Sequence, residues 1–296
     1  MIDSTDKQNS TTDIVQVTEY NNSGIRPITI SRIAIGYVQS GTKYLYNNDR
    51  FYQINSGDIF ILNPGFHYEE NIIGNGDRFS EIIFYLPAST LQQATCGLGH
   101  NFGLKIASRH NCDKCFALNF AISKSDTSLQ NFFASVEQSL RLSFLRENEV
   151  FKQIKLNELI YLILTGEDNC TKRKLLRAAD TSSGQFVNII YENIFNDISV
   201  EKLAELTNRS LTSFKKEFKR IFNSSPHHWI IEERLDRAKV LLSVTNHTVS
   251  EIGAECGFSN ISHFIKLFKQ RYQHTPVAYR RLFSAVSDEY HNVASE

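Results

Sequence analysis

The chain has 296 residues, of which 41% are hydrophobic and 22% are charged, a composition typical of folded proteins and not of disordered ones. The length favours two domains. The polar start has no signal-peptide core, and no uncharged apolar run could span a bilayer, so we expect a cytoplasmic protein. Five cysteines, an odd number, suit reduced thiols better than a disulfide framework.

The formal net charge of zero hides an uneven distribution along the chain. Residues 1–171 carry a net charge of −4 and residues 172–281 carry +7, while the residues after 281 add only acidic groups. Positive charge gathered in one part of a chain is typical of a module that binds a polyanion. We expect a basic C-terminal domain followed by an acidic tail over 285–296.

The N-terminal part is predicted to consist of β-strands between residues 28 and 86, where β-branched and aromatic residues often alternate with polar ones. Turn-forming stretches separate these strands, at 47–49, 56–58, 63–65 and 74–77. Several short strands with regular turn signals indicate a sandwich or a small barrel. Residues 1–27 are expected to be disordered or to lead into the first strand.

The spacing of apolar residues changes to three and four in the segments 128–145 and 147–165, which predicts two amphipathic helices. The short gap between them implies an antiparallel hairpin, so the regulatory part would span 28–165. Polar and charged residues dominate 166–184. We predict an interdomain linker there, with some helix around 172–179 and solvated basic side chains.

A thirteen-residue pattern occurs twice near the C-terminus, as FKKEFKRIFNSSP at 214–226 and FIKLFKQRYQHTP at 264–276. A short helix-forming segment precedes each copy and ends at a residue that tolerates a positive φ, Asn208 or Gly257. A short helix, a tight turn and a second helix form a helix-turn-helix. We therefore predict an all-α domain with two such units over 185–284.

Capping residues support both units. Ser199 and Thr248 are placed to cap the first helix of each unit, and Glu251 would complete a capping box with Thr248. Ser210 and Ser259 are predicted to cap the second helices. After each repeated helix, a Ser or Thr followed by proline predicts the start of another helix, at Ser225–Pro226 and Thr275–Pro276.

Each repeated helix is expected to have a buried and a free face. Aromatic residues at i, i+4 and i+8 predict the buried stripes, which are Phe214, Phe218 and Phe222 in the first copy and Phe264, Phe268 and Tyr272 in the second. The free faces carry Thr212, Lys215, Lys216 and Lys219 in the first copy and Ser262, His263 and Lys266 in the second. Such side chains can hydrogen-bond base edges, so double-stranded DNA is the expected partner. The helix between the units would place them in successive major grooves, about 34 Å apart.

At these residues the chain resembles the AraC/XylS family of bacterial transcription regulators. Residues 249–281 are similar to the family signature, including Gly257 and Phe258, the F-x-x-x-F-K core and the closing T-P-x-x-Y-R, and residues 185–284 resemble its DNA-binding domain throughout. The resemblance implies base contacts at Thr212, Lys215, Lys216, Ser262 and Lys266, with Asn260, Ile261 and His263 as further candidates. Arg209 stands where a small or glycine-containing turn is usual and is expected at a phosphate.

The N-terminal part resembles the regulatory domain of this family, and residues 57–67 are similar to its turn between barrel strands. The resemblance implies an α+β protein, with a cupin-like β-barrel and a dimerising helical hairpin before the helix-turn-helix domain. It further implies a homodimer, an activator more than a repressor, that works with RNA polymerase and answers to a small molecule or a partner protein. No cofactor is expected.

The alternative is a cupin-type sensor or metal-dependent protein whose helical domain binds another protein. A cupin metal site needs a His-x-His pair with a glutamate and a further histidine, but the strands offer only His67, with Glu69 and Glu70 nearby. We expect His67 at a turn or at the barrel mouth, and no enzyme. Phosphate-binding loops and nucleophile elbows are also absent from the sequence.

A cysteine-rich segment raises a further hypothesis. Cys112 and Cys115 form a Cys-x-x-Cys pair, which could bind zinc or form a redox disulfide, and other thiol or imidazole side chains lie near them in the sequence: Cys96, His100 and His110. The spacing fits no standard zinc module, so ordinary reduced cysteines are the simpler interpretation.

Overall fold

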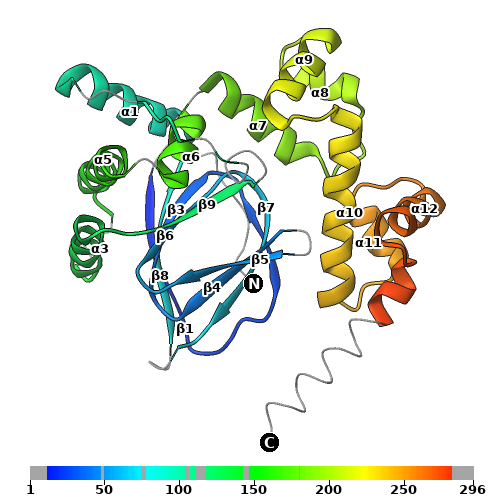
Figure 1. The fold of residues 1–296 in the computed structure, drawn as a ribbon, viewed down its shortest axis with the longest axis horizontal. Coiled ribbons are helices and arrows are strands. Elements are labelled where there is room, and N and C mark those ends of the chain that lie inside the picture. The colour runs from blue at the N-terminus through cyan, green and yellow to red at the C-terminus, as the bar shows by residue number, and fades with distance from the viewer. Residues whose placement is uncertain are drawn as a thin grey trace, which may run out of the picture. The chain divides into compact units, whose positions relative to one another are not determined.

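The computed structural model describes residues 12–47, 50–74, 78–103, 107–110, 112, 118–142, 147–167, 169–179 and 181–281. The chain divides into two compact units, Met1–Asn188 and Ile189–Glu296. In Figure 1 the first unit combines strands with helices, whereas the second is built of helices alone. Among the helices of the described residues, none has the length and apolar character that crossing a membrane requires.

The strands of the first unit form two antiparallel sheets. One contains, in spatial order, β1 (Asp13–Glu19), β8 (Phe79–Leu86), β3 (Ile33–Ser40), β6 (Asp58–Leu62) and β9 (Phe120–Lys124). The other contains β2 (Arg26–Ile30), β7 (Gly65–Ile72), β4 (Thr42–Asn47) and β5 (Arg50–Asn55). The expected strand-rich, cupin-like domain is confirmed. Two of its strands, β1 and β9, lie outside the range in which strands were predicted.

The two sheets pack face to face instead of closing into one continuous barrel. Residues of both sheets share a core, including Leu45 and Ile54 of the second sheet and Phe60 and Phe79 of the first. Large side chains that fill the space between two sheets are typical of sandwich packing. Gly36 makes room for this core, because a Cβ atom there would lie 2.1 Å from the ring of Phe60.

The helices α3 (Thr127–Leu140) and α5 (Glu149–Thr165) form the predicted amphipathic pair, capped by Asp126 and Asn148. Their apolar faces share a core with the first sheet, in which Phe133 stacks on Tyr37 with ring centroids 4.5 Å apart. The helix α1 (Ala88–Phe102) contributes to the same core. Residues 143–146, which comprise the end of the first predicted helix and the gap after it, lie outside the described residues.

The prediction of a linker over 166–184 is wrong for most of its length. Helix α6 (Cys170–Ala179) belongs to the core of the first unit, where Leu175 is fully buried. Lys174, expected in solvent, is also buried, and its ammonium group donates to the Leu118 carbonyl oxygen at 2.6 Å. The reason is that α6 is amphipathic, so its apolar side packs while the long basic side chains reach outward or to backbone oxygens.

His67 lies inside strand β7 and not at a turn. Its side chain is buried, and its Nε2 atom lies 2.8 Å from the carbonyl oxygen of Asn63. Burial lowers the pKa of His67 to about 4, so the ring is neutral and donates this hydrogen bond. Glu69 pairs with Arg26, and Glu70 accepts a hydrogen bond from the Tyr46 hydroxyl at 2.5 Å. These residues are engaged in structural contacts within the sheet.

The second unit consists of short helices arranged around a long one. After α7 (Thr181–Asn193), which leads into it, come α8 (Val200–Leu206), α9 (Leu211–Phe222), α10 (Pro226–Val244), α11 (Val249–Glu255), α12 (Ile261–Tyr272) and a last helical stretch over 276–281. Figure 1 shows α8 and α9 toward one end of α10, and α11 and α12 toward the other. The expected acidic tail over 285–296 lies outside the described residues.

Candidate nucleic-acid interface

The two helix-turn-helix units repeat each other at the level of the backbone. The first helix of each has seven residues and the second has twelve. Each first helix ends at a residue with nearly the same dihedral angles, φ −88° and ψ 7° at Thr207 and φ −87° and ψ 7° at Cys256. A residue with positive φ follows, Asn208 at 55° and Gly257 at 82°. The sequence repeat therefore encodes the same turn twice.

The turns differ by one residue, and this corrects one predicted cap. Asn208 and Gly257 are 49 positions apart in the chain, but the helices that follow are related by 50 positions. Ser210 caps α9 as predicted, whereas α12 is capped by Asn260 and not by Ser259. The Asn260 side-chain oxygen accepts from the backbone amide of His263 at 2.9 Å. The oxygen of this predicted base-contact residue is thus used to begin the helix.

The remaining caps are in their predicted places. Ser199 caps α8, and Thr248 with Glu251 forms the reciprocal capping box of α11. Thr275 accepts the backbone amide of the residue three positions later at 3.3 Å. Ser225 precedes α10 without a side-chain hydrogen bond, and Pro226 occupies the first turn. Local capping energies therefore fix the ends of these helices.

Aromatic packing attaches both second helices to α10. In the first helix-turn-helix unit, Phe214 and Phe218 are fully buried. Phe222 is half-buried, and its ring centroid lies 4.3 Å from that of Trp229. Rings of this kind contribute more than their buried area alone when they meet at an angle. The predicted inward stripe of the first copy is confirmed, and its outermost ring closes against α10.

The second copy is attached in a related way. Phe264 and Phe268 are fully buried, and the hydroxyl of half-buried Tyr272 donates to the carboxylate of Asp236 on α10. Burial raises the pKa of Asp236 to about 6, partly offset by the Tyr272 hydrogen bond. A polar contact thus replaces the outer ring contact of the first unit.

Arg234 of α10 links the two helix-turn-helix units, a role that no sequence pattern indicates. Its guanidinium donates three hydrogen bonds of 2.6 Å, to the carbonyl oxygens of Ile194, Asn196 and Gly257. The first two carbonyls lie just before α8, and the third lies in the turn between α11 and α12. One buried side chain therefore holds the entrance of the first unit and the turn of the second on the same helix.

The exposed face of α9 carries the predicted polar and basic side chains. Thr212, Lys215, Lys216 and Lys219 are all exposed. Neither Lys216 nor Lys219 forms an ion pair within the part of the chain that the structure describes. Arg220 is instead bound to Glu217 on its own helix at 2.8 Å. The lysines of this face are available to an anionic ligand.

Arg209, which is expected at a phosphate, also contacts its own turn. Its side chain is half-buried, and one guanidinium nitrogen donates to the Thr207 carbonyl oxygen at 2.8 Å. In the second helix-turn-helix unit the residue equivalent to Arg209 is Phe258, which lies in the core. At least part of the hydrogen-bonding capacity of Arg209 therefore closes the first turn.

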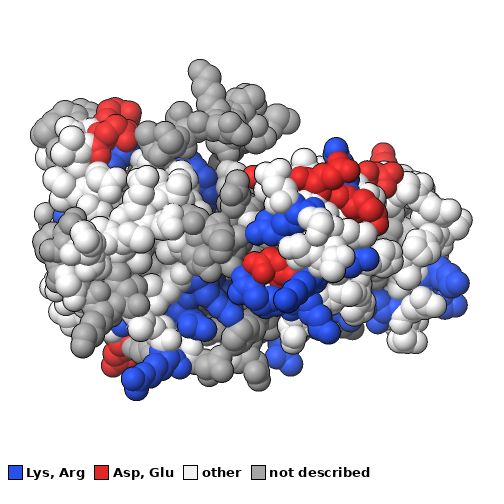
Figure 2. Space-filling model, turned by 90° about the horizontal axis from the view of Figure 1, so that it is seen from above, with Lys and Arg blue, Asp and Glu red and all other residues white. Residues whose placement is uncertain are grey.

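The exposed face of α12 corresponds to that of α9 at four positions. Ser262, His263 and Lys266 are exposed, and Ile261 is half-buried. With a spacing of 50 residues, Thr212 corresponds to Ser262, Ser213 to His263, Lys216 to Lys266 and Lys219 to Lys269. The repeat thus adds Ser213 and Lys269, both exposed, which the sequence reasoning missed although the repeated pattern contained the signal. Figure 2 shows Lys and Arg side chains gathered in clusters on the visible face, with Asp and Glu side chains among and beside them.

Two family models match the chain. The model described as a helix-turn-helix domain matches residues 203–282, and the model of the ExsA N-terminal regulatory domain matches residues 34–172. A solved structure of ToxT from Vibrio cholerae has 13% sequence identity and a TM-score of 0.44, and the similarity covers 91% of this chain and 98% of that one.

Curated relatives are also regulators by name. An uncharacterized HTH-type transcriptional regulator of Staphylococcus aureus (strain COL) is 26% identical over 260 residues, which are 85% of this chain and 32% of the relative. Another, in the cgkA 5′ region of Pseudoalteromonas carrageenovora, is 35% identical over 96 residues, which are 32% of this chain and 57% of that protein. The chain thus spans about a third of the length of the Staphylococcus aureus relatives it matches. Because the matched domains cover parts of both the sheet-containing and the helical unit, these similarities support an AraC family regulator.

Proposed function

We propose that this protein regulates transcription by placing α9 and α12 in two adjacent major grooves of double-stranded DNA. The observation that carries the proposal is the positional match between two exposed helix faces. Each presents a hydroxyl side chain in its first turn, Thr212 or Ser262, and a lysine one turn later, Lys216 or Lys266. Hydroxyl and ammonium groups at these positions can donate to base edges such as guanine O6 and N7.

The second pair of lysines supports a phosphate-binding role. Lys219 and Lys269 lie one turn further along their helices and are exposed. Lysines at the edge of a helix in the groove neutralise phosphates, which contributes affinity without reading sequence. The net charge of +7 over residues 172–281 is consistent with such contacts.

The direct test is a gel shift of the full chain on DNA fragments selected from a random library, at two salt concentrations. We expect tight binding to selected fragments, weaker binding to scrambled ones, and a steep loss of affinity as salt rises. Binding to neither DNA, or binding that ignores both sequence and salt, would contradict the proposal and favour a helical domain that binds protein.

The helix pair α3 and α5 of the first compact unit, Met1–Asn188, supports a homodimer as the functional form. On α5, Val150, Ile154 and Tyr161 are 69%, 58% and 45% exposed, and they share one helix face by their spacing. Large apolar side chains grouped on an exposed face mark an interaction surface. A second copy of the same chain would bury these residues against their equivalents, as symmetric dimers do.

Sedimentation of the full chain at micromolar concentration tests the dimer. We expect a dimer for the natural sequence and a monomer for Ile154→Glu, because a carboxylate on this face would lose its hydration in the interface. Gln153→Glu adds the same charge on an exposed neighbouring position and should remain a dimer. A monomer for the natural sequence, with and without DNA, would contradict the dimer.

Control of DNA binding is assigned to the first unit, which matches a domain described as regulatory. The effector is a small molecule or a partner protein, and the site of action is the cytoplasm, where bacterial DNA lies. We propose RNA polymerase as the partner at the promoter and activation as the outcome. Transcription in vitro from a promoter with the selected site would rise on adding the protein, whereas a fall would identify a repressor.

A further inference from the structure

Three side chains with metal-binding atoms converge in the first compact unit, which does not contain the helix-turn-helix units. They are His110 and Cys112, which precede β9, and Cys170, the first residue of α6. Their ligand atoms all lie within 4.8 Å of one another. His110 Nε2 lies 3.2 Å from Cys170 Sγ, and the two sulfur atoms are 3.6 Å apart. The sequence hypothesis paired Cys112 with Cys115, which lies outside the described residues, and missed Cys170.

These distances match the edges of a zinc coordination shell. With Zn–S bonds of about 2.3 Å and Zn–N bonds of about 2.0 Å, tetrahedral geometry sets S–S edges of about 3.8 Å and S–N edges of about 3.5 Å. The observed separations of 3.6 and 3.2 Å are close to both values. A zinc ion could therefore be held by three protein ligands after small side-chain rotations.

We propose that His110, Cys112 and Cys170 form a Cys₂His zinc site, with the fourth position filled by water or an external donor. Thiolate and imidazole are the ligands that Zn²⁺ prefers, and two thiolates balance its charge. Cys170 also lies in the first turn of α6, where free backbone amides favour a negatively charged ligand. The site is independent of the DNA-binding residues.

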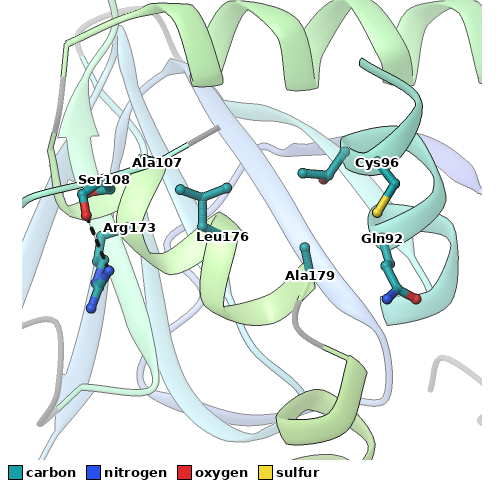
Figure 3. A pocket seen from close by; sticks show the side chains of 8 residues that line it. Gln92, Cys96, Ala107, Ser108, Arg173, Leu176 and Ala179 are labelled. Atoms are coloured by element: carbon teal, nitrogen blue, oxygen red, sulfur yellow. Dashed lines mark hydrogen bonds between the residues drawn. The ribbon is translucent and has the colours of Figure 1, made fainter. Parts of the chain in front are cut away.

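Contacts around the site hold its two halves together without the metal. The carbonyl oxygen of Ser108 accepts a hydrogen bond of 3.4 Å from Arg173 of α6, and the Ser108 hydroxyl accepts from the His110 backbone amide at 3.2 Å. Figure 3 shows the first of these contacts beside a cavity of about 450 Å³, which is also lined by Cys96 and Leu176. These contacts connect α6, which carries Cys170, to the segment that carries His110.

A disulfide between Cys112 and Cys170 is the competing chemistry. It would require the sulfur atoms to approach from 3.6 Å to about 2.05 Å, and it would leave the neighbouring imidazole without a part in the reaction. Zinc uses all three side chains and requires only small side-chain rotations. The metal would also join positions 58 residues apart in the sequence, which constrains the unfolded chain and stabilises the first unit.

The experiment uses the full chain, purified under reducing conditions, with metal content measured by mass spectrometry and Co²⁺ as a spectroscopic substitute for zinc. We expect one zinc ion per chain, and with Co²⁺ the intense visible bands of tetrahedral coordination together with thiolate-to-cobalt charge transfer. Cys112→Ser, Cys170→Ser and His110→Ala should each weaken zinc binding by at least roughly 100-fold, since loss of an outer-shell partner alone typically costs 10–100-fold.

Two matched controls separate the site from general thiol chemistry. Cys96→Ser removes an exposed thiol and His100→Ala removes an exposed imidazole, both on α1, and both variants should bind zinc as the natural chain does. If a ligand variant fails to fold, the cobalt spectrum of the natural chain still tests the proposal. Substoichiometric zinc, an octahedral cobalt spectrum, unchanged zinc binding by Cys170→Ser, or a Cys112–Cys170 disulfide in the protein kept under reducing conditions would each overturn it.

Discussion

The two helix-turn-helix units share a backbone but are stabilised differently. The second turn is built on Gly257, whose carbonyl oxygen binds Arg234, and on Phe258, which lies in the core. The first turn has Asn208 at the position with positive φ. The Arg209 side chain stabilises this turn by donating to the Thr207 carbonyl oxygen. The exposed faces differ as well, because Lys215 of α9 corresponds to half-buried Ile265 of α12. The comparison indicates that the turn of the second helix-turn-helix unit is stabilised by contacts with the rest of its domain. The first helix-turn-helix unit carries more of the positive charge.

Arg234→Ala is expected to have the largest effect, because it removes the connection between the units. Three carbonyl oxygens would lose a charged donor, and at about 1.5–3 kcal/mol for each such hydrogen bond we expect a loss of about 4 kcal/mol of unfolding free energy after partial rehydration. Urea denaturation of the full chain measures it. Arg220→Ala on α9, whose 57% exposed side chain binds Glu217 through Nη2 at 2.8 Å, serves as the comparison and should cost less, about 1 kcal/mol. Equal losses would show that Arg234 has no special role.

The two turns should respond very differently to alanine. At Gly257 a Cβ atom would lie 2.6 Å from the Phe195 carbonyl oxygen in a backbone with φ of 82°, so Gly257→Ala should cost about 3 kcal/mol. Asn208→Ala meets the unfavourable φ of 55° but replaces a side chain that already has a Cβ atom, and should cost about 1 kcal/mol. Urea denaturation of both variants decides this. Similar losses would mean that close packing at the second turn contributes little.

Loss of one lysine from either exposed face, on α9 or on α12, should weaken DNA binding. Lys216→Ala and Lys266→Ala are each expected to weaken binding to the selected DNA by about 1–3 kcal/mol if each lysine reads a guanine. Lys124→Ala removes the same charge from an 88% exposed side chain on β9 and should leave DNA affinity unchanged. Quantitative gel shifts measure these differences. Equal losses on selected and scrambled DNA would reassign the lysines to phosphate contacts.

The helix caps are expected to show the smallest effects. Ser210→Ala and Asn260→Ala each remove a side-chain acceptor from the first turn of a proposed recognition helix and should cost about 1 kcal/mol. Ser259→Ala, one residue before the observed cap of α12, should be nearly neutral. Thermal or urea unfolding compares the three variants. A larger loss for Ser259→Ala than for Asn260→Ala would contradict the longer second turn.

Local features of the second unit could be predicted because short-range chemistry determines them. Ser199 and Thr248 cap their helices, Asn208 has a positive φ, and the phenylalanines face inward, all as the spacing indicated. The sequence pattern does not distinguish Ser259 from Asn260 as the cap of α12, because both are good capping residues and the extra residue in the second turn has no sequence signature. Capping preferences therefore allow either Ser259 or Asn260 to cap α12, and the tertiary structure selects Asn260.

Long-range features could not be predicted from local patterns. Arg234 is one of several charged residues on α10, and only the fold brings three carbonyl oxygens to it. Cys170 is far in sequence from Cys112, so their proximity needed the position of α6. The sequence of α6 resembles a linker because basic residues stand among the apolar ones, including Leu175, that pack into the core.

The most direct measurement is a hydroxyl-radical footprint of the full chain on its selected DNA, repeated with Lys216→Ala and Lys266→Ala. One chain is expected to protect two DNA segments about one helical turn apart, on one side of the duplex. Each variant should lose protection in a different segment. A single protected segment per chain, or the same change for both variants, would show that α9 and α12 do not read neighbouring grooves.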